Sequence, residues 1–337
     1  MSGLPEAPLL EVRGLHTELA GPDGLLPVVR DVDLSVPYRG SLGIVGESGS
    51  GKSMLAKSLM NLLPARAVSA SRSMTYDGRP FDPRRPSSRA MWGAEIAMVF
   101  QDPLTAMNPV RTVGAQIGDT LRVHDGLSRR QARRVAVDLL GQVGIPSPGL
   151  RVSQYPHELS GGMRQRAMIA MAIACRPRLL IADEPTTGLD VTVQRQILTL
   201  LRRLREEHDM ALVLISHDLG MVADEVEQVS VMYAGELVEG LSADALRRHE
   251  ARHPYARALL AAHPDVNAPI GQRLEAIPGR PPSPGQPVAG CRFAPRCAHA
   301  RDLCRAEAPA AELDGPRLVR CHFPVLTATP NEAQHVR

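Results

Sequence analysis

The clearest chemical signal in the sequence is a glycine-rich stretch of the kind that binds phosphate. It consists of Gly46, Glu47, Ser48, Gly49, Ser50, Gly51, Lys52 and Ser53. The pattern G-x-x-x-x-G-K-[ST] here follows an apolar run and opens a predicted helix, which is the context it requires. The glycines let backbone N–H groups point at phosphate oxygens, and the helix N-terminus adds its positive end. We therefore expect a nucleoside triphosphate here, with Lys52 contacting its β- and γ-phosphates and Ser53 binding Mg²⁺.

A pair of acidic residues stands at the end of another apolar run. Residues 179–182 read Leu-Leu-Ile-Ala and are followed by Asp183 and Glu184. A strand of this kind delivers Asp183 to the metal side of a nucleotide, and a carboxylate just past the strand end can order and deprotonate water. A lone acidic pair after a strand more often serves as a cap. Downstream of a phosphate loop, we interpret Asp183 as an Mg²⁺ ligand and Glu184 as the catalytic base.

A second predicted anion-binding helix start precedes that strand. Residues 159–166 read Leu-Ser-Gly-Gly-Met-Arg-Gln-Arg, so Ser160, Gly161 and Gly162 stand where a helix begins. A helix N-terminus attracts anions, although this stretch alone also fits a plain helix cap. Together with residues 46–53 and the acidic pair, the stretch closely resembles the signature of the ATP-binding cassette (ABC) family.

The resemblance implies a fold, a cofactor set and further site residues. The family has an α/β P-loop NTPase fold, with a RecA-like core, an antiparallel β-subdomain and an inserted helical subdomain, and it uses ATP and Mg²⁺. Gln101 is similar to the Q-loop glutamine, which senses the γ-phosphate and Mg²⁺ and abuts the transmembrane partner. Asp190 resembles the end of the D-loop, and His217 resembles the switch histidine. The resemblance thus implies ATP hydrolysis with Glu184, His217 and Gln101 as catalytic residues.

Family members sandwich two nucleotides between two cassettes, with the signature of one meeting the γ-phosphate bound to the other. This chain carries one set of motifs, so the resemblance implies a second ABC ATPase subunit. Four stretches look like the ATPases of dipeptide and oligopeptide importers: residues 100–109, 155–166, 253–260 and 290–297. That subgroup implies two transmembrane permease subunits and an extracytoplasmic peptide-binding protein. It also favours a sister ATPase over a second copy, and a translocase peripheral to the cytoplasmic face of the cell membrane.

Three alternative functions remain open at this point. The solute could be nickel or another small molecule, since a minority of the subgroup transports these. A non-transport cassette acting on DNA or ribosomes is disfavoured, because such proteins usually carry two cassettes, a long coiled coil or zinc-finger insertions. A net charge of +3 also gives no argument for nucleic acid. A redox sensor with a vestigial ATPase is disfavoured by the intact Lys52, Glu184 and His217.

Two positions depart from the general family pattern. The fifth signature residue is Met163, where the general family usually has glutamine, although methionine is usual in the peptide-importer subgroup. The family also often stacks adenine on an aromatic residue in its first strands. Residues 15–20 contain none, and Leu19 is the candidate for that place.

Four of the five cysteines, Cys291, Cys297, Cys304 and Cys321, lie near the C-terminus. The fifth, Cys175, sits among small apolar residues and is interpreted as a core residue. The spacing of the four matches neither a zinc pattern nor a ferredoxin pattern, so zinc, an iron–sulfur cluster and free thiols all stay open. The resemblance to importer ATPases with a C-terminal [4Fe–4S] cluster favours a structural cluster. We do not expect it to take part in hydrolysis, because it lies far in sequence from the phosphate loop.

The elements that must position these residues alternate along the chain. Strands are predicted at 9–12, 31–36, 41–45, 94–100, 178–183 and 211–216, helices at 46–63 and 192–207, and helical structure over 111–178. Alternating strands and helices favour a parallel α/β core. We predict a nucleotide-binding domain over 1–245 with a helical subdomain at about 102–178. A small C-terminal accessory region of the peptide-transporter type, with the cysteine cluster, is predicted over 246–337, because residues 277–287 are rich in proline and glycine.

Composition agrees with a core built from aliphatic side chains. Hydrophobic residues make up 44% of the 337 residues, but aromatic residues only 3%. The N-terminus shows no secretory signal, and no apolar run approaches the roughly 18 residues that a membrane span needs. We therefore expect a soluble protein in a reducing compartment, where disulfides are rare.

Overall fold

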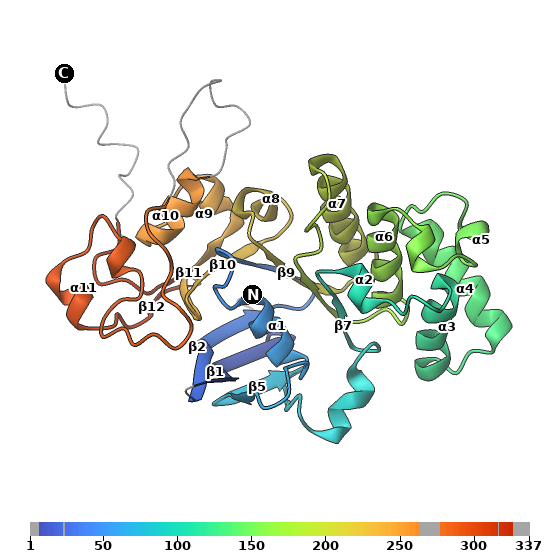
Figure 1. Cartoon of the computed structure of the whole chain (residues 1–337), viewed down its shortest axis with the longest axis horizontal. Coiled ribbons are helices and arrows are strands. Elements are labelled where there is room, and N and C mark those ends of the chain that lie inside the picture. The colour runs from blue at the N-terminus through green and yellow to red at the C-terminus, as the bar shows by residue number, and fades with distance from the viewer. Residues whose placement is uncertain (1–6, 23, 263–276, 316, 326–337) are drawn as a thin grey trace, which may run out of the picture.

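The computed structural model describes residues 7–22, 24–262, 277–315 and 317–325, and it contains two sheets (Figure 1). The larger sheet has the strand order β12-β13-β11-β10-β3-β9-β8-β7. Its parallel centre consists of β3 (Ser41–Val45), β9 (Ala211–Ser216), β8 (Leu179–Asp183), β7 (Ile96–Val99) and β10 (Gln228–Tyr233). Every residue of β3, β8, β9 and β7 is buried, as expected for parallel strands covered on both faces.

The smaller sheet is antiparallel and covers one face of this core. It consists of β1 (Leu10–Gly21), β2 (Gly24–Val36), β4 (Val68–Ala70), β5 (Ser73–Tyr76) and β6 (Arg79–Pro80). Helix α1 (Lys52–Leu59) lies between the two sheets, where Leu55 packs in one cluster with Ile44 and Ile181 of the larger sheet and Val12 of the smaller. This shared cluster fixes α1, and with it the preceding loop, against both sheets.

The stretch expected to be helical over 111–178 is divided into several elements at one end of the molecule (Figure 1). They are α3 (Val113–His124), α4 (Arg129–Gln142), α5 (Pro148–Arg151), the 3₁₀ turn η2 (Pro156–Glu158) and α6 (Gly161–Ala172), and the short α2 (Pro103–Ala106) precedes the stretch. The breaks have local causes. Ser128 forms a capping box with Gln131 at the start of α4, and Pro148 and Pro156 each occupy the first turn of a new element. In Figure 1, helix α7 (Val191–Glu207) lies on the opposite side of α6 from α5. Another 3₁₀ turn, η1 (Pro86–Met91), precedes β7.

The C-terminal part is joined to the larger sheet. Its elements are β11 (Glu236–Ser242), α8 (Leu219–Ala223), α9 (Ala243–Arg247), α10 (Pro254–Ala261), η3 (Ala294–Arg296), α11 (Asp302–Ala306), β12 (Glu312–Asp314) and β13 (Arg317–Val319). Strand β13 pairs antiparallel with β11, and β12 pairs with β13. The fully buried Glu239 of β11 strengthens this junction, because it accepts hydrogen bonds from the backbone N–H groups of Arg252 and His253 at 2.7 and 2.9 Å. Late residues therefore extend the catalytic sheet itself.

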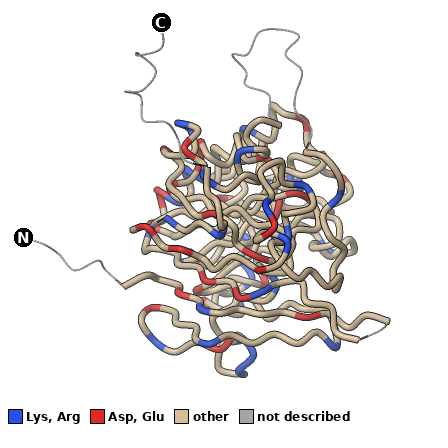
Figure 2. The backbone as a smooth tube through the Cα atoms, turned by 90° about the vertical axis from the view of Figure 1, so that its left-hand side faces the viewer, with Lys and Arg blue, Asp and Glu red and all other residues tan. Residues whose placement is uncertain are grey.

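Charged side chains are spread over the molecule. Figure 2 shows basic and acidic residues interspersed along the backbone, in agreement with the small net charge of +3. Among the described helices, none is both long and apolar enough to cross a membrane.

Candidate nucleotide-binding and catalytic site

The glycine-rich loop connects β3 to α1 at the carboxyl end of the parallel strands. Gly46 has φ +159° and Gly51 has φ +108°. A Cβ on Gly46 would lie 2.2 Å from the Met232 carbonyl oxygen, and one on Gly51 would lie 2.5 Å from the Val28 carbonyl oxygen. Only glycine fits these two positions, because both the backbone conformation and the close neighbours exclude a side chain. Ser48 and Gly49 form the exposed tip of the loop.

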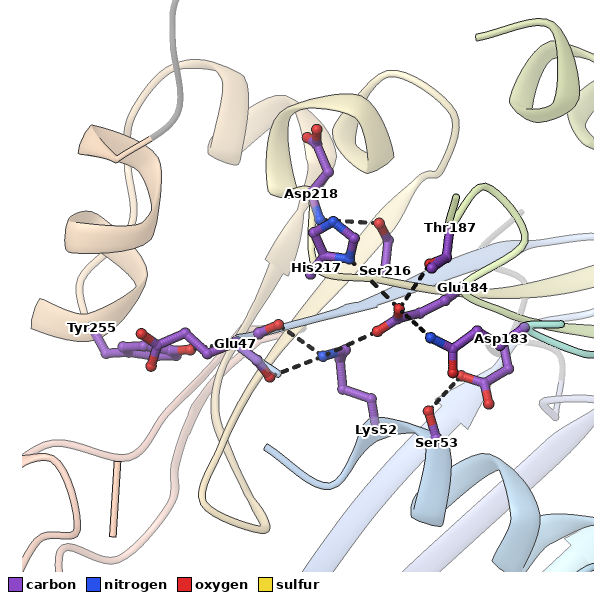
Figure 3. A network of polar contacts seen from close by, with 12 residues as sticks. Glu47, Lys52, Ser53, Asp183, Glu184, Thr187, Ser216, His217, Asp218 and Tyr255 are labelled. Carbon is purple, nitrogen blue, oxygen red and sulfur yellow. Dashed lines mark hydrogen bonds and ion pairs between the residues drawn. The ribbon is translucent and has the colours of Figure 1, made fainter. Parts of the chain in front are cut away.

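Lys52, the first residue of α1, points back into this loop (Figure 3). Its Nζ donates to the carbonyl oxygens of Gly46 and Glu47 at 2.8 and 3.0 Å and lies 3.8 Å from Oε1 of Glu184. The side chain is 4% exposed. Burial lowers the pKa of Lys52, while the carboxylates of Glu184 and Asp183 oppose that shift. The ammonium group is thus held inside the loop, in a position to meet phosphate oxygens.

Ser53 and Asp183 meet beside Lys52. The Ser53 hydroxyl donates to Oδ1 of Asp183 at 2.8 Å, although 130 residues separate them. Asp183 ends β8 and is 3% exposed; burial raises its pKa, and the hydrogen bond from Ser53 opposes that shift. A hydroxyl and a carboxylate are hard oxygen ligands of the kind that Mg²⁺ takes when it also binds a nucleotide. This donor pair fits the predicted Mg²⁺ position.

Glu184 stands at the centre of the polar network in Figure 3. Its Oε2 accepts hydrogen bonds from Nε2 of Gln101 at 3.1 Å and from the Thr187 hydroxyl at 3.0 Å, and it lies 3.6 Å from Nδ1 of His217. Its backbone N–H donates to the Ile215 carbonyl at 2.9 Å. The φ of Glu184 is +44°, a conformation that is costly for a residue with a side chain and that concentrates at functional sites.

The structure thus brings together most of the residues predicted from the sequence. Gln101 lies just after β7, Asp183 is the last residue of β8 and Glu184 follows it, and His217 follows β9. All three strands are parallel, so their carboxyl ends meet at one edge beside the glycine-rich loop. His217 is 57% exposed and Gln101 is exposed, so this side of the network is open. Basic and acidic groups are therefore placed for chemistry on a bound phosphate.

Other predicted residues lie apart from this network. Ser160 caps α6 by accepting a hydrogen bond from the Met163 N–H at 3.3 Å, and Gly161 and Gly162 form the first turn. Asp190 caps α7 by accepting from the Val193 N–H at 3.0 Å. Within the described residues, no hydrogen bond or ion pair joins these positions to Lys52 or Glu184. Their roles stay predictions.

The predicted adenine position is not defined by a contact. Leu19 lies in β1 and pairs with Leu26 of β2, near the tip of the hairpin that these strands form. The assignment of Leu19 to adenine stays a prediction.

Sequence reasoning missed two residues that contact the glycine-rich loop, Tyr255 and Arg296. The Tyr255 hydroxyl accepts a hydrogen bond from the Glu47 N–H at 2.9 Å, and Arg296 forms an ion pair with the Glu47 carboxylate. The region that seemed remote from hydrolysis by sequence is therefore in direct contact with the phosphate loop. Tyr255 and Arg296 belong to the stretches 253–260 and 290–297, which had served only to indicate the peptide-importer subgroup. No local sequence pattern links either residue to Glu47.

The four C-terminal cysteines line one small cavity, together with Phe293, Phe323 and other residues. Burial raises the pKa of the Cys291, Cys297 and Cys321 thiols, that of Cys321 to about 11. In the part of the chain that the structure describes, no group of three or more histidine, cysteine or acidic side chains is arranged to hold a metal ion. The iron–sulfur prediction is therefore not supported by ligand geometry. The separate Cys175 lies against the helical core, with Sγ 3.8 Å from the Thr120 carbonyl oxygen.

Comparisons with known proteins agree with this geometry. The family model described as ABC transporter matches residues 29–187, and the one described as Oligopeptide/dipeptide transporter, C-terminal region, matches residues 238–304. A putative peptide import ATP-binding protein of Brucella abortus is 48% identical over 94% of this chain and 96% of its own length. The dipeptide transport ATP-binding protein DppD of Escherichia coli is 47% identical over 94% of this chain and 97% of its own length.

Solved structures share the fold at lower sequence identity. A dimeric ATP-binding cassette in a post-hydrolysis state, bound to ADP and phosphate, has a TM-score of 0.62 at 22% identity and covers 69% of this chain and 98% of its own. The protein cbiO1 of Clostridium perfringens, part of an ABC transporter complex, has a TM-score of 0.60 at 24% identity, with 73% and 92% covered. Both cover less of this chain than the sequence relatives do.

Proposed function

We propose that the network around Glu184 hydrolyses ATP to drive peptide uptake. The chain belongs to the ATP-binding subunits of di- and oligopeptide ABC importers, and it is an ABC ATPase whose hydrolysis of ATP is coupled to transport. The observation that carries this proposal is the position of Glu184. Its carboxylate is held by Gln101, Thr187 and His217 at 3.0–3.6 Å, next to the loop that binds phosphate.

Each residue of the network takes a role in this proposal. Lys52 and the N–H groups of residues 46–53 bind and orient the triphosphate. Glu184 orders the attacking water and accepts its proton, while Gln101 and His217 keep that carboxylate aimed at the γ-phosphate. Ser53, Asp183 and Gln101 would hold Mg²⁺, which when bound neutralises charge on the phosphate oxygens. The exposed side of the network leaves room for the nucleotide and for a second cassette.

The second cassette completes the site in this proposal. Ser160, Gly161 and Gly162 at the start of α6 would meet the γ-phosphate bound to a partner ATPase, and Asp190 at the start of α7 would lie at the junction. We favour a sister ATPase as partner. Two permease subunits and an extracytoplasmic peptide-binding protein complete the complex, with Gln101 and the helical block facing a permease. The chain is then peripheral to the cytoplasmic face of the membrane and binds no nucleic acid.

Measuring which solute stimulates ATP hydrolysis and is taken up tests this function directly. The complex, purified with its own permeases and placed in vesicles, should hydrolyse ATP faster when di- or oligopeptides and the binding protein are supplied. Uptake of labelled peptide should depend on ATP, and Glu184→Gln should abolish it. Stimulation by nickel or another small solute, without any response to peptides, would replace the peptide assignment. Crosslinks from residues 101–115 to ribosome or nucleic acid instead of a permease would overturn the transport role.

We also propose that residues 1–245 are the nucleotide-binding domain, with its helical subdomain over about 102–178, and that residues 246–337 are the C-terminal region.

We propose further that this C-terminal region holds a [4Fe–4S] cluster on Cys291, Cys297, Cys304 and Cys321. Support comes from the chemistry of the donor set, since four thiols line one cavity.

Metal analysis tests the cluster. Protein purified without oxygen should be brown and carry about four irons per chain. Cys304→Ser should bleach it, whereas Cys175→Ser should not. Colourless protein with one zinc per chain would replace the cluster by a structural zinc site, and colourless protein without metal would leave free thiols.

A further inference from the structure

Arg296, the last residue of η3, reaches from the cysteine-bearing segment to the phosphate loop. Its Nη1 lies 2.6 Å from Oε2 of Glu47 and its Nη2 lies 2.9 Å from Oε1, so the guanidinium grips the carboxylate with two parallel hydrogen bonds. The two residues are 249 positions apart in sequence. The Arg296 side chain is 3% exposed and that of Glu47 is 29% exposed. This is a buried arginine paired with a carboxylate at the rim of the ATP site.

The guanidinium is held on all sides. Its Nε donates to the Pro278 carbonyl at 2.8 Å, and Nη1 also lies 3.4 Å from the Tyr233 hydroxyl. The guanidinium carbon is 5.7 Å from the centre of the Tyr233 ring and 6.0 Å from that of Phe293. The hydrogen bonds to Glu47 raise the pKa of Arg296, so the guanidinium stays ionised in spite of its burial. A buried charge is stable only when it is paired and hydrogen-bonded in this way.

Glu47 is correspondingly fixed at each of its polar groups. Arg296 holds the carboxylate, the Tyr255 hydroxyl accepts from its N–H at 2.9 Å, and Lys52 donates to its carbonyl at 3.0 Å. Two of these three partners come from residues beyond 250. A carboxylate in a loop that receives a triphosphate repels it, and a bound cation beside that carboxylate cancels the repulsion.

We propose that Arg296 is a positioning residue of the ATP site, which fixes the phosphate loop through Glu47 and cancels the charge of that carboxylate. Cys291 and Cys297 flank η3, so the order of the cysteine-bearing segment sets the affinity for ATP. The inference rests on the ATP-binding role of the chain. It depends neither on the transported solute nor on which metal, if any, the cysteines bind.

The test compares full-length variants by titration with Mg–ATP in a calorimeter. Arg296→Ala should weaken binding about tenfold, within the range usual for coupling between two sites. Glu47→Gln should instead tighten binding, since the arginine charge then remains without its counter-charge. The double variant should bind with an affinity between those of the two single variants. Arg296→Lys keeps the charge but not the two-pronged geometry, and should restore binding in part.

The opposite signs separate positioning from support of the fold. If Glu47→Gln weakens ATP binding as much as Arg296→Ala does, the pair only stabilises the fold and the proposal is wrong. An affinity of Arg296→Ala within twofold of the wild type would also overturn it. Arg305→Ala, which removes a 62% exposed arginine of the same segment, is the matched control and should bind ATP normally.

Steady-state kinetics of the assembled complex give an independent readout. Arg296→Ala should raise KM for ATP while kcat at saturating ATP is kept, because the chemical groups around Glu184 are unchanged. A fall in kcat with an unchanged KM would contradict the proposal. If Arg296→Ala does not fold, Arg296→Lys and Glu47→Gln decide: weaker binding in the first with tighter binding in the second supports the proposal, and any other combination overturns it. Lys52→Ala tests ATP binding itself, because it removes the cation that faces the phosphates; if this variant bound Mg–ATP like the wild type, the ATP-binding role would fail as well as the role of Arg296.

Discussion

The catalytic loops and the C-terminal segment meet the phosphate loop from different sides, and they differ in how they hold it. On the catalytic side, Gln101 and His217 are exposed, and their side chains contact Glu184. Figure 3 shows His217 beside Glu184. On the C-terminal side, Tyr255 and Arg296 are buried, and both bind Glu47. In the proposed mechanism, the exposed side performs the chemistry and the buried side fixes the loop that presents the substrate.

The largest effect is expected on the catalytic side. Glu184→Gln should lower the rate of ATP hydrolysis at least about a hundredfold, because a positioned general base contributes roughly 10²–10⁴ in rate. ATP binding should be kept, since the amide still fits the site. Single-turnover hydrolysis and nucleotide binding, measured on the same preparation, check both parts. A rate near that of the wild type would remove Glu184 from the mechanism.

A substitution in the phosphate loop itself should weaken ATP binding more than a substitution of Tyr255 or Arg296, which support the loop. Lys52→Ala removes a buried cation that faces the phosphates, and charge-assisted hydrogen bonds contribute about 1.5–3 kcal/mol each. We expect the affinity for Mg–ATP to fall by roughly tenfold to hundredfold. Calorimetric titration measures this, with thermal unfolding in the absence of nucleotide as the control for folding. An unchanged affinity would show that Lys52 does not face the phosphates.

The C-terminal side should respond to acid through His253. This residue is 1% exposed, its Nδ1 accepts a hydrogen bond from the Tyr255 N–H at 3.0 Å, and burial lowers its pKa to about 3. Below about pH 6.5 the unfolded chain therefore binds a proton that the folded chain does not. The free energy of unfolding should fall by up to about 1.4 kcal/mol per pH unit between pH 6.5 and 3.

Asparagine at position 253 separates this contribution from that of other titrating groups. His253→Asn keeps an acceptor for the Tyr255 N–H but cannot be protonated. Denaturant unfolding at pH 7.5 and 5.5 should show a smaller loss of stability in the variant than in the wild type. The same pH dependence in both would mean that His253 is accessible to protons in the folded state.

The smallest effect is expected for Tyr255→Phe, which tests whether the C-terminal side affects ATP binding without affecting the chemistry. Tyr255→Phe removes one acceptor, and the Glu47 N–H then has only water or another group to bind. A neutral hydrogen bond contributes about 0.5–1.5 kcal/mol, so ATP affinity should fall only about twofold to tenfold. Hydrolysis at saturating ATP should remain at the wild-type rate. Tyr38→Phe, which changes a tyrosine bonded to Asp77 instead, is the matched control.

The catalytic side could be predicted from the sequence because each of its parts is local. The runs 41–45, 178–183 and 211–216 are apolar except at their ends, and they form β3, β8 and β9 within one residue of the predicted bounds. The resemblance to the ABC family assigned His217 to the site of Asp183 and Glu184, and the structure places its ring 3.6 Å from Glu184 because β8 and β9 are parallel neighbours. The antiparallel β1 was predicted over 9–12 but runs to Gly21, since its pairing with β2 continues through several irregularities in register.

The C-terminal side could not be predicted because its contacts are distant in sequence and its elements are short. Strands β12 and β13 have three residues each, and β12 is exposed throughout. Such segments carry too few side chains to show a period. The ion pair between Arg296 and Glu47 leaves no local trace, since each residue alone reads as an ordinary surface charge. In the helical block, the serine and proline caps that divide 111–178 were present in the sequence but were not used to place boundaries.

The separation between Glu47 and Arg296 also has a consequence in time. A ribosome adds about 5–20 residues per second, so roughly 12–50 s pass between the synthesis of these two residues, which are 249 positions apart. From residue 217 onward the nascent chain contains the residues of the catalytic network, but the carboxylate of Glu47 still lacks Arg296. Chains released after residue 217 but before residue 296 would therefore carry every ATP motif without the arginine that holds the loop.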